Sequence, residues 1–146
     1  MSHVALYETQ IRLALSGGSE NLAADPGWQT LQDAVDVVAK EHGGQVTDSV
    51  TDTEGRRTRC DVALSVPEFR RGVGVRVNRG TGEVSFVYDT WGGYERTAQA
   101  ICAEILQNYT ALAVSRALAE MHYQVDVQTV ADEGRLGKKV LVRGEL

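Results

Sequence analysis

Long apolar runs, paired cysteines and an excess of positive charge are all absent from this sequence of 146 residues. The longest apolar stretches, such as Ala98 to Ala103, are far shorter than the roughly 20 residues that cross a bilayer. Residues 1–3 do not open the basic-then-apolar pattern of a secretory signal. We therefore expect a soluble, cytoplasmic protein that makes no membrane contact.

Positive charge is scarce, with 15 Lys and Arg against 20 Asp and Glu, which gives a net charge of −5. This balance disfavours non-specific attraction to nucleic acid. Cys60 and Cys102 form no C-x-x-C pair, and no histidine is spaced to complete a zinc site with them. The three histidines, His3, His42 and His122, are interpreted as surface or strand-end residues. We expect two buried, reduced thiols and neither a metal nor a cofactor.

The residues that are present alternate between short strand patterns and two helical patterns. Apolar residues recur at helical spacing over residues 28–42 and 94–121, and the widening apolar stripe of the second helix allows a break near Asn108. Alternation of apolar and polar residues predicts the strands, which cover residues 3–13, 45–51, 59–66, 73–77, 83–89, 123–129 and 140–142.

Short antiparallel strands with only two helices favour an α+β fold. We predict a single mostly antiparallel β-sheet of about six to seven strands, with both helices packed on one face. The expected order is β-α-β-β-β-β-α-β-β. Residues 1–146 would form one domain, in which the Gly-rich and Ser-rich residues 16–27 are a flexible loop. An open sheet of this kind exposes edge strands, which makes a homo-oligomer plausible.

Residues 54–81 are rich in arginine, with seven arginines against three acidic residues. A solvated strand face is the favoured interpretation of this segment. The functional alternative is an electropositive patch, including Arg70, Arg71 and Arg76, that docks an acidic partner. RNA binding is a further alternative, weakened because Phe69 is the only aromatic residue in the segment to stack on a base.

Three aromatic residues, Tyr88, Trp91 and Tyr94, lie together where a predicted strand meets the long helix. This density is unusual in a chain with only 6% aromatic residues. Trp91 could simply close the edge of the core, with Asp89 or Thr90 as the helix cap. The alternative is a docking site for a protein partner, because exposed Trp and Tyr anchor interfaces. The docking hypothesis predicts an exposed Trp91.

A catalytic or ligand-binding cleft lined by His3, Asp89 and Glu95 is the alternative from another class of function. It requires these side chains to converge within hydrogen-bond reach or across one water.

Several short motifs together resemble one known family. They are Ser2-His3-Val4, Thr9-Gln10-Ile11, Asp61 through Glu68, Gly72-Val73-Gly74, Asp89-Thr90-Trp91-Gly92, Gln107-Asn108-Tyr109 and Val140-Leu141-Val142-Arg143. The chain resembles the plastid and cyanobacterial family of hypothetical open reading frame thirty-five, whose bacterial members form a domain of unknown function. It departs from that family in a longer segment at 16–27 and in the pair Arg70-Arg71, which replaces Gly and aromatic residues.

The resemblance implies an α+β domain without an established activity, so it supplies no catalytic residue. The occurrence of family members beside genes for AAA-type ATPases implies an adaptor serving such an ATPase. We therefore predict a non-enzymatic protein-binding module, with Tyr88, Trp91, Tyr94, Arg70, Arg71 and Arg76 as the residues that contact the partner.

Overall fold

The computed structural model describes residues 4–15, 21–121, 124–131 and 138–145. The elements follow one another as strand β1 (Val4–Arg12), 3₁₀ helix η1 (Leu22–Ala24), helix α1 (Pro26–Glu41), strands β2 (Gln45–Thr51), β3 (Arg57–Val66), β4 (Phe69–Val77) and β5 (Glu83–Asp89), helix α2 (Glu95–Glu120), and strands β6 (Gln124–Ala131) and β7 (Lys138–Glu145).

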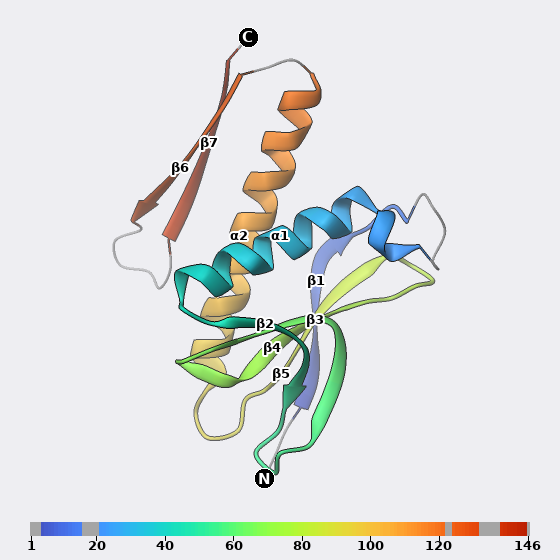
Figure 1. Cartoon of the computed structure of the whole chain (residues 1–146), viewed down its shortest axis with the longest axis vertical. Helices are drawn as coiled ribbons and strands as arrows, with labels where there is room; N and C mark the ends of the chain where they lie inside the picture. Colours follow the sequence, from blue (N-terminus) through green and yellow to red (C-terminus); the bar gives the residue numbers. More distant parts are fainter. Residues whose placement is uncertain (1–3, 16–20, 122–123, 132–137, 146) are drawn as a thin grey trace.

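Five strands form one antiparallel sheet in the order β1-β5-β4-β3-β2 (Figure 1). Strands β2 to β5 make a meander, and its last strand, β5, pairs with the first strand of the chain, β1, so that Leu6 lies opposite Val87. This arrangement leaves β1 and β2 at the two edges of the sheet. The predicted α+β class, with an antiparallel sheet and two helices, is confirmed.

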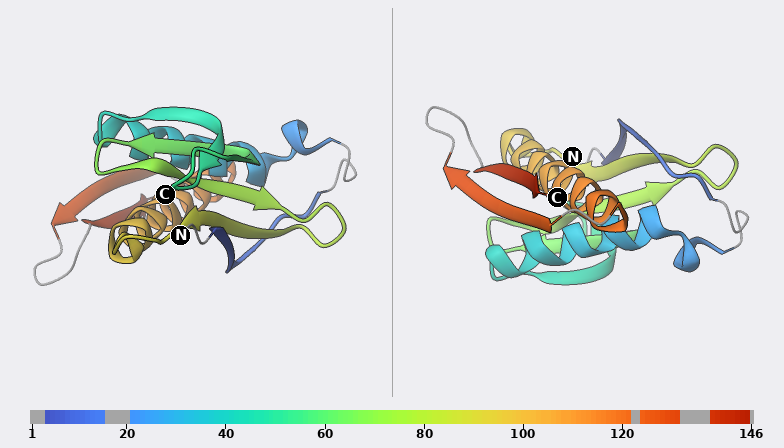
Figure 2. Two further views of the ribbon diagram at one scale, coloured as in Figure 1. Left: turned by 90° about the horizontal axis from the view of Figure 1, so that it is seen from below. Right: turned by 90° about the horizontal axis from the view of Figure 1, so that it is seen from above.

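The prediction of a single sheet of about six to seven strands is wrong, because β6 and β7 pair only with each other in a second sheet. The reason is the length of α2, whose 26 residues carry the chain ~39 Å along the helix axis, away from the end of β5. The hairpin therefore begins beyond the larger sheet and packs beside α2 (Figure 2).

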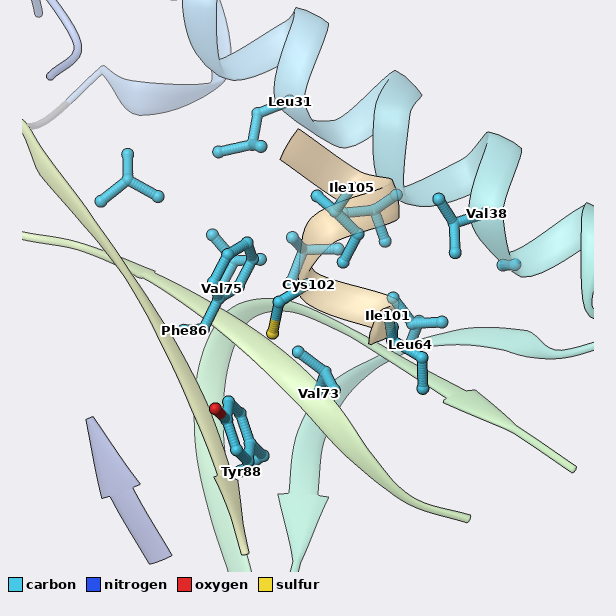
Figure 3. Packing of buried hydrophobic residues seen from close by; sticks show 14 of the residues in the cluster. Leu31, Val38, Leu64, Val73, Val75, Phe86, Tyr88, Ile101, Cys102 and Ile105 are labelled. Atoms are coloured by element: carbon cyan, nitrogen blue, oxygen red, sulfur yellow. The ribbon is translucent and has the colours of Figure 1, made fainter. Parts of the chain in front are cut away.

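Both helices cover the same face of the five-stranded sheet, and the main core lies between them and the strands. Leu31 and Val38 of α1 and Ile101 and Ile105 of α2 point toward strand residues of that face, which are Leu64, Val73, Val75, Phe86 and Tyr88 (Figure 3). Burial of these aliphatic and aromatic side chains is the main source of stability for a domain of this size.

Helix α1 begins two residues before the predicted start at Trp28 because the sequence Asp25-Pro26 favours a helix start. Asp25 accepts hydrogen bonds from the backbone N–H of Trp28 and of Leu15, each at 3.0 Å. Helix α2 is unbroken at Asn108, whose side chain donates to the carbonyl of Glu104 at 2.9 Å.

Strand β2 curls over the other face of the sheet, where Val50 packs against Cys60, Ala63 and Val87. Gly74 allows this close approach, because a Cβ at that position would overlap the Sγ of Cys60. Cys60 and Cys102 are both free and buried, as expected from the sequence. Burial raises the pKa of the Cys102 thiol to about 12, so it is not a thiolate nucleophile at neutral pH. The curl of β2 brings the turn after it toward the end of β5.

Candidate functional site

The turn from β5 to α2, residues 90–94, holds two aromatic side chains at the surface. Gly92 and Gly93 have φ values of 88° and 83°, which side-chain-bearing residues rarely adopt. Trp91 is 51% exposed and Tyr94 is 43% exposed. The exposed Trp91 that the docking hypothesis requires is therefore present.

Asp89 holds this turn in place from beneath and is fully buried. Its carboxylate accepts a hydrogen bond from the backbone N–H of Trp91 at 2.9 Å and from that of Thr53 at 3.3 Å. Asp89 is not the helix cap that the sequence suggests, since Tyr94 occupies the N-cap of α2 without a side-chain cap bond. Its effect is instead to fix the backbone on which Trp91 is mounted.

Besides the two exposed aromatic residues and Asp89, the site contains Arg71, whose side chain is largely buried. One guanidinium nitrogen lies 3.6 Å from the carboxylate of Asp89, and another donates to the backbone carbonyl of Trp91. The guanidinium carbon lies 4.8 Å from the ring centre of Tyr94 and 5.4 Å from that of Phe69, at cation–π distance. We call Arg71, Trp91 and Tyr94 the aromatic junction.

Tyr88 does not belong to this surface. Its side chain is buried in the main core and stacks on Tyr7, with ring centres 4.2 Å apart and planes 7° from parallel. Burial raises the pKa of the Tyr88 hydroxyl. The predicted contact of Tyr88 with a partner is replaced by packing inside the fold, because Tyr88 and Asp89 are successive residues of β5 and point to opposite faces.

Arg70 and Arg76 also lie away from the aromatic junction. Arg70 follows the same alternation and points away from Arg71, lining a hollow of about 280 Å³ with Gly43 and Gly44. Arg76 donates to the backbone carbonyl of Arg59 at 3.1 and 3.3 Å. The predicted six-residue set is therefore divided among the core, the junction and two separate parts of β4.

Some of the other arginines of residues 54–81 are paired with neighbouring carboxylates. Arg79 is paired with Asp61 at 2.7 Å, and Arg56 is paired with Asp52 and Glu54. Only Arg57, Arg59 and Arg70 among the seven make no side-chain hydrogen bond or ion pair within the described ranges. Internal pairing reduces the charge available to an RNA backbone.

The alternative cleft of His3, Asp89 and Glu95 has no geometric support in the described residues. His3 lies outside them. Asp89 is buried among backbone partners, whereas Glu95 is exposed on the first turn of α2 and accepts from Gln99 at 3.4 Å. An Asp89 with its oxygens engaged in this way cannot act as a general acid or base at a surface cleft without breaking the turn.

A charged cluster around His42 is the main feature that sequence reasoning does not find. The Nε2 of His42 lies 2.7 Å from the carboxylate of Glu104, and its Nδ1 lies 3.6 Å from that of Glu68. These residues come from the end of α1, from α2 and from the turn between β3 and β4. No local spacing signals the cluster, because His42 and Glu104 are 62 positions apart.

Within the residues that the structure covers, no helix is both long and apolar enough to cross a membrane. Comparisons with protein-family models, with curated proteins and with solved structures each find no match. The functional argument therefore rests on the side chains themselves.

Proposed function

We propose that this chain is a non-enzymatic protein-binding module that docks a partner through the aromatic junction. The observation that carries the proposal is the exposure of Trp91 and Tyr94, which lie two glycines apart on one turn whose backbone is held by Asp89 and Arg71. Exposed Trp, Tyr and Arg are the residue types that most often dominate binding energy at protein interfaces.

The fixed backbone of the turn also favours binding. The backbone N–H of Trp91 donates to the carboxylate of Asp89, and its carbonyl accepts from Arg71, so the indole belongs to a segment whose backbone is already ordered. A partner that packs against it has little backbone freedom to immobilise, and this lowers the entropic cost of association.

The resemblance to the open reading frame thirty-five family supports an AAA-type ATPase as the first partner to test, with this chain as its adaptor. Trp91 would insert into an apolar recess of the partner, and Tyr94 and the exposed edge of Arg71 would surround it.

An affinity capture from the native host lysate tests the proposal, with Trp91→Ala and Tyr94→Ala compared with the wild type. The matched control is Met121→Ala, because Met121 is 61% exposed but follows α2 at the end far from the junction. We expect the same specific protein to be captured by the wild type and the control and lost in both junction variants. Equal capture by all four proteins, each shown to be folded by circular dichroism, would overturn the proposal.

The outlying arginines separate the junction from a general charge effect. Arg70→Glu and Arg76→Glu reverse exposed charges away from the junction, and Arg71 is left unchanged because it holds the turn. We expect these two variants to retain the partner, with at most a change in association rate that salt screens. Loss of the partner in these variants with retention in Trp91→Ala would move the site to the arginines.

A further inference from the structure

Three elements of the fold meet at His42. The residue is the C-cap of α1, and its backbone N–H donates to the carbonyl of Val38 at 3.1 Å. The imidazole, a quarter exposed, lies between Glu104 of α2 and Glu68 of the turn between β3 and β4. None of these three residues belongs to the aromatic junction.

The two carboxylates approach opposite sides of the ring, one at each nitrogen. They therefore do not converge on a single point where a metal ion could sit between them. The arrangement instead depends on the protonation state of the imidazole. A neutral imidazole has one N–H donor and one lone pair, whereas an imidazolium has two donors, and ionised carboxylates only accept.

Only the protonated ring can therefore satisfy both glutamates at once. With a neutral ring, the hydrogen bond at 2.7 Å to Glu104 can persist, but the other nitrogen then presents a lone pair to Glu68. The C-terminus of α1 adds to this preference, since its carbonyl ends favour a positive charge on the capping residue.

Two positive residues lie on the elements that surround the ring. Lys40 lies in the last turn of α1, and Arg70 of β4 lines the hollow beside Gly43 and Gly44. Burial lowers the pKa of His42, but the hydrogen bond and charge of Glu104, together with Glu68, raise it by more, so that the pKa lies above its usual value.

We propose that His42 is a protonation-operated latch, which in its charged form joins the turn between β3 and β4 to α1 and α2 and which releases Glu68 when it loses its proton. Phe69 follows Glu68 directly, and its ring lies 5.5 Å from that of Tyr94. Opening of the latch therefore loosens the start of β4, where Phe69 contacts Tyr94 of the aromatic junction. The latch itself does not depend on whether that junction binds a partner.

The direction of the pH effect follows from the raised pKa. The latch is closed below the usual histidine pKa of about 6.5, and it opens as the pH rises through the higher pKa that His42 has in the folded protein. For each unit by which the pKa of His42 with the latch closed exceeds its pKa with the latch open, protonation shifts the equilibrium toward the closed state about tenfold.

Titration of the histidine ring signals by NMR tests the proton requirement. The signals of His42 are assigned by their disappearance in His42→Gln. We expect a His42 pKa above 6.5 in the wild type, a large decrease in Glu104→Gln, a smaller decrease in Glu68→Gln and almost none in the matched control Glu41→Gln, which removes the neighbouring exposed charge. A wild-type pKa at or below 6.5, or an equal decrease in the control, would overturn the proposal.

Backbone hydrogen exchange tests the release of the turn. Phe69 pairs with Val66 at the end of the turn, and we expect the protection factor of its amide, corrected for the intrinsic pH dependence of exchange, to decrease severalfold as His42 deprotonates. In His42→Gln it should be low at every pH. Protection factors that do not change across the titration of His42 would show that the ring titrates without operating a latch.

Discussion

Two charged clusters tie loops of this fold to helix ends, and they differ in what keeps them charged. At the start of α2, the fully buried Asp89 binds Arg71 and two backbone N–H groups. At the end of α1, the partly exposed His42 lies between two glutamates. Arginine stays protonated at all relevant pH values, whereas histidine titrates near neutrality. The first cluster is therefore a permanent fixture of the junction, and the second responds to pH.

The largest effect should come from removing the buried carboxylate. Asp89→Ala removes the anion beside Arg71 and the carboxylate that accepts from the N–H groups of Thr53 and Trp91, so we expect a loss of about 3–5 kcal/mol in unfolding free energy. Urea denaturation measures this loss. The control is Asp33→Ala, which breaks the exposed pair with Arg116 and should cost less than about 1 kcal/mol. Equal losses in the two variants would remove the distinction between a buried and an exposed ion pair.

A smaller loss should follow from Arg71→Lys, which retains the positive charge but not the planar group. Lysine cannot reach Asp89 and the carbonyl of Trp91 in the same fork geometry, and it stacks less well between Phe69 and Tyr94. We expect a cost of about 1–2 kcal/mol in urea denaturation. The matched variant Arg79→Lys, at the exposed pair with Asp61, should change stability by less than about 0.5 kcal/mol. If both changes are equally mild, only charge matters at Arg71.

The His42 cluster should give a loss that depends on pH. Glu104 is only 14% exposed and lies 2.7 Å from the ring, whereas Glu68 is 55% exposed and 3.6 Å away. We expect Glu104→Gln to cost about 1 kcal/mol at a pH below the usual histidine value, and Glu68→Gln less than about 0.5 kcal/mol. Because the folded pKa is raised, both losses should shrink as the pH rises through it. Denaturation curves at acidic and alkaline pH would show the contrast, and a pH-independent loss would contradict it.

The local patterns of the sequence predict most elements well, because alternation and helical spacing are local properties. The bounds of β2 and β5 agree with the prediction, and α1 begins two residues earlier than predicted, at Pro26, and ends one residue earlier, at Glu41. The separate hairpin of β6 and β7 is not predictable in this way, since which strands pair is decided by the length of α2 and by packing.

The candidate site shows the same limit. The sequence identifies the cluster around Trp91, but the burial of Tyr88 and the opposite directions of Arg70 and Arg71 follow from a strand register that the sequence alone leaves open. Asp89 depends on Thr53, 36 positions away, which reaches it only because β2 curls past Gly74. His42 likewise finds its carboxylates through tertiary contacts.

The smallest change in stability should come from Trp91→Ala, although we expect its effect on binding to be large. The contacts of Trp91 with Asp89 and Arg71 use its backbone N–H and carbonyl, which alanine also supplies. The indole is half exposed, so its removal should change the unfolding free energy by less than about 0.5 kcal/mol in urea denaturation. A loss comparable to that of Asp89→Ala would mean that the indole packs against the core and is not available to bind a partner. A near-neutral variant that no longer captures its partner would instead separate the two parts of this junction, with Asp89 and Arg71 holding the fold and Trp91 available for binding.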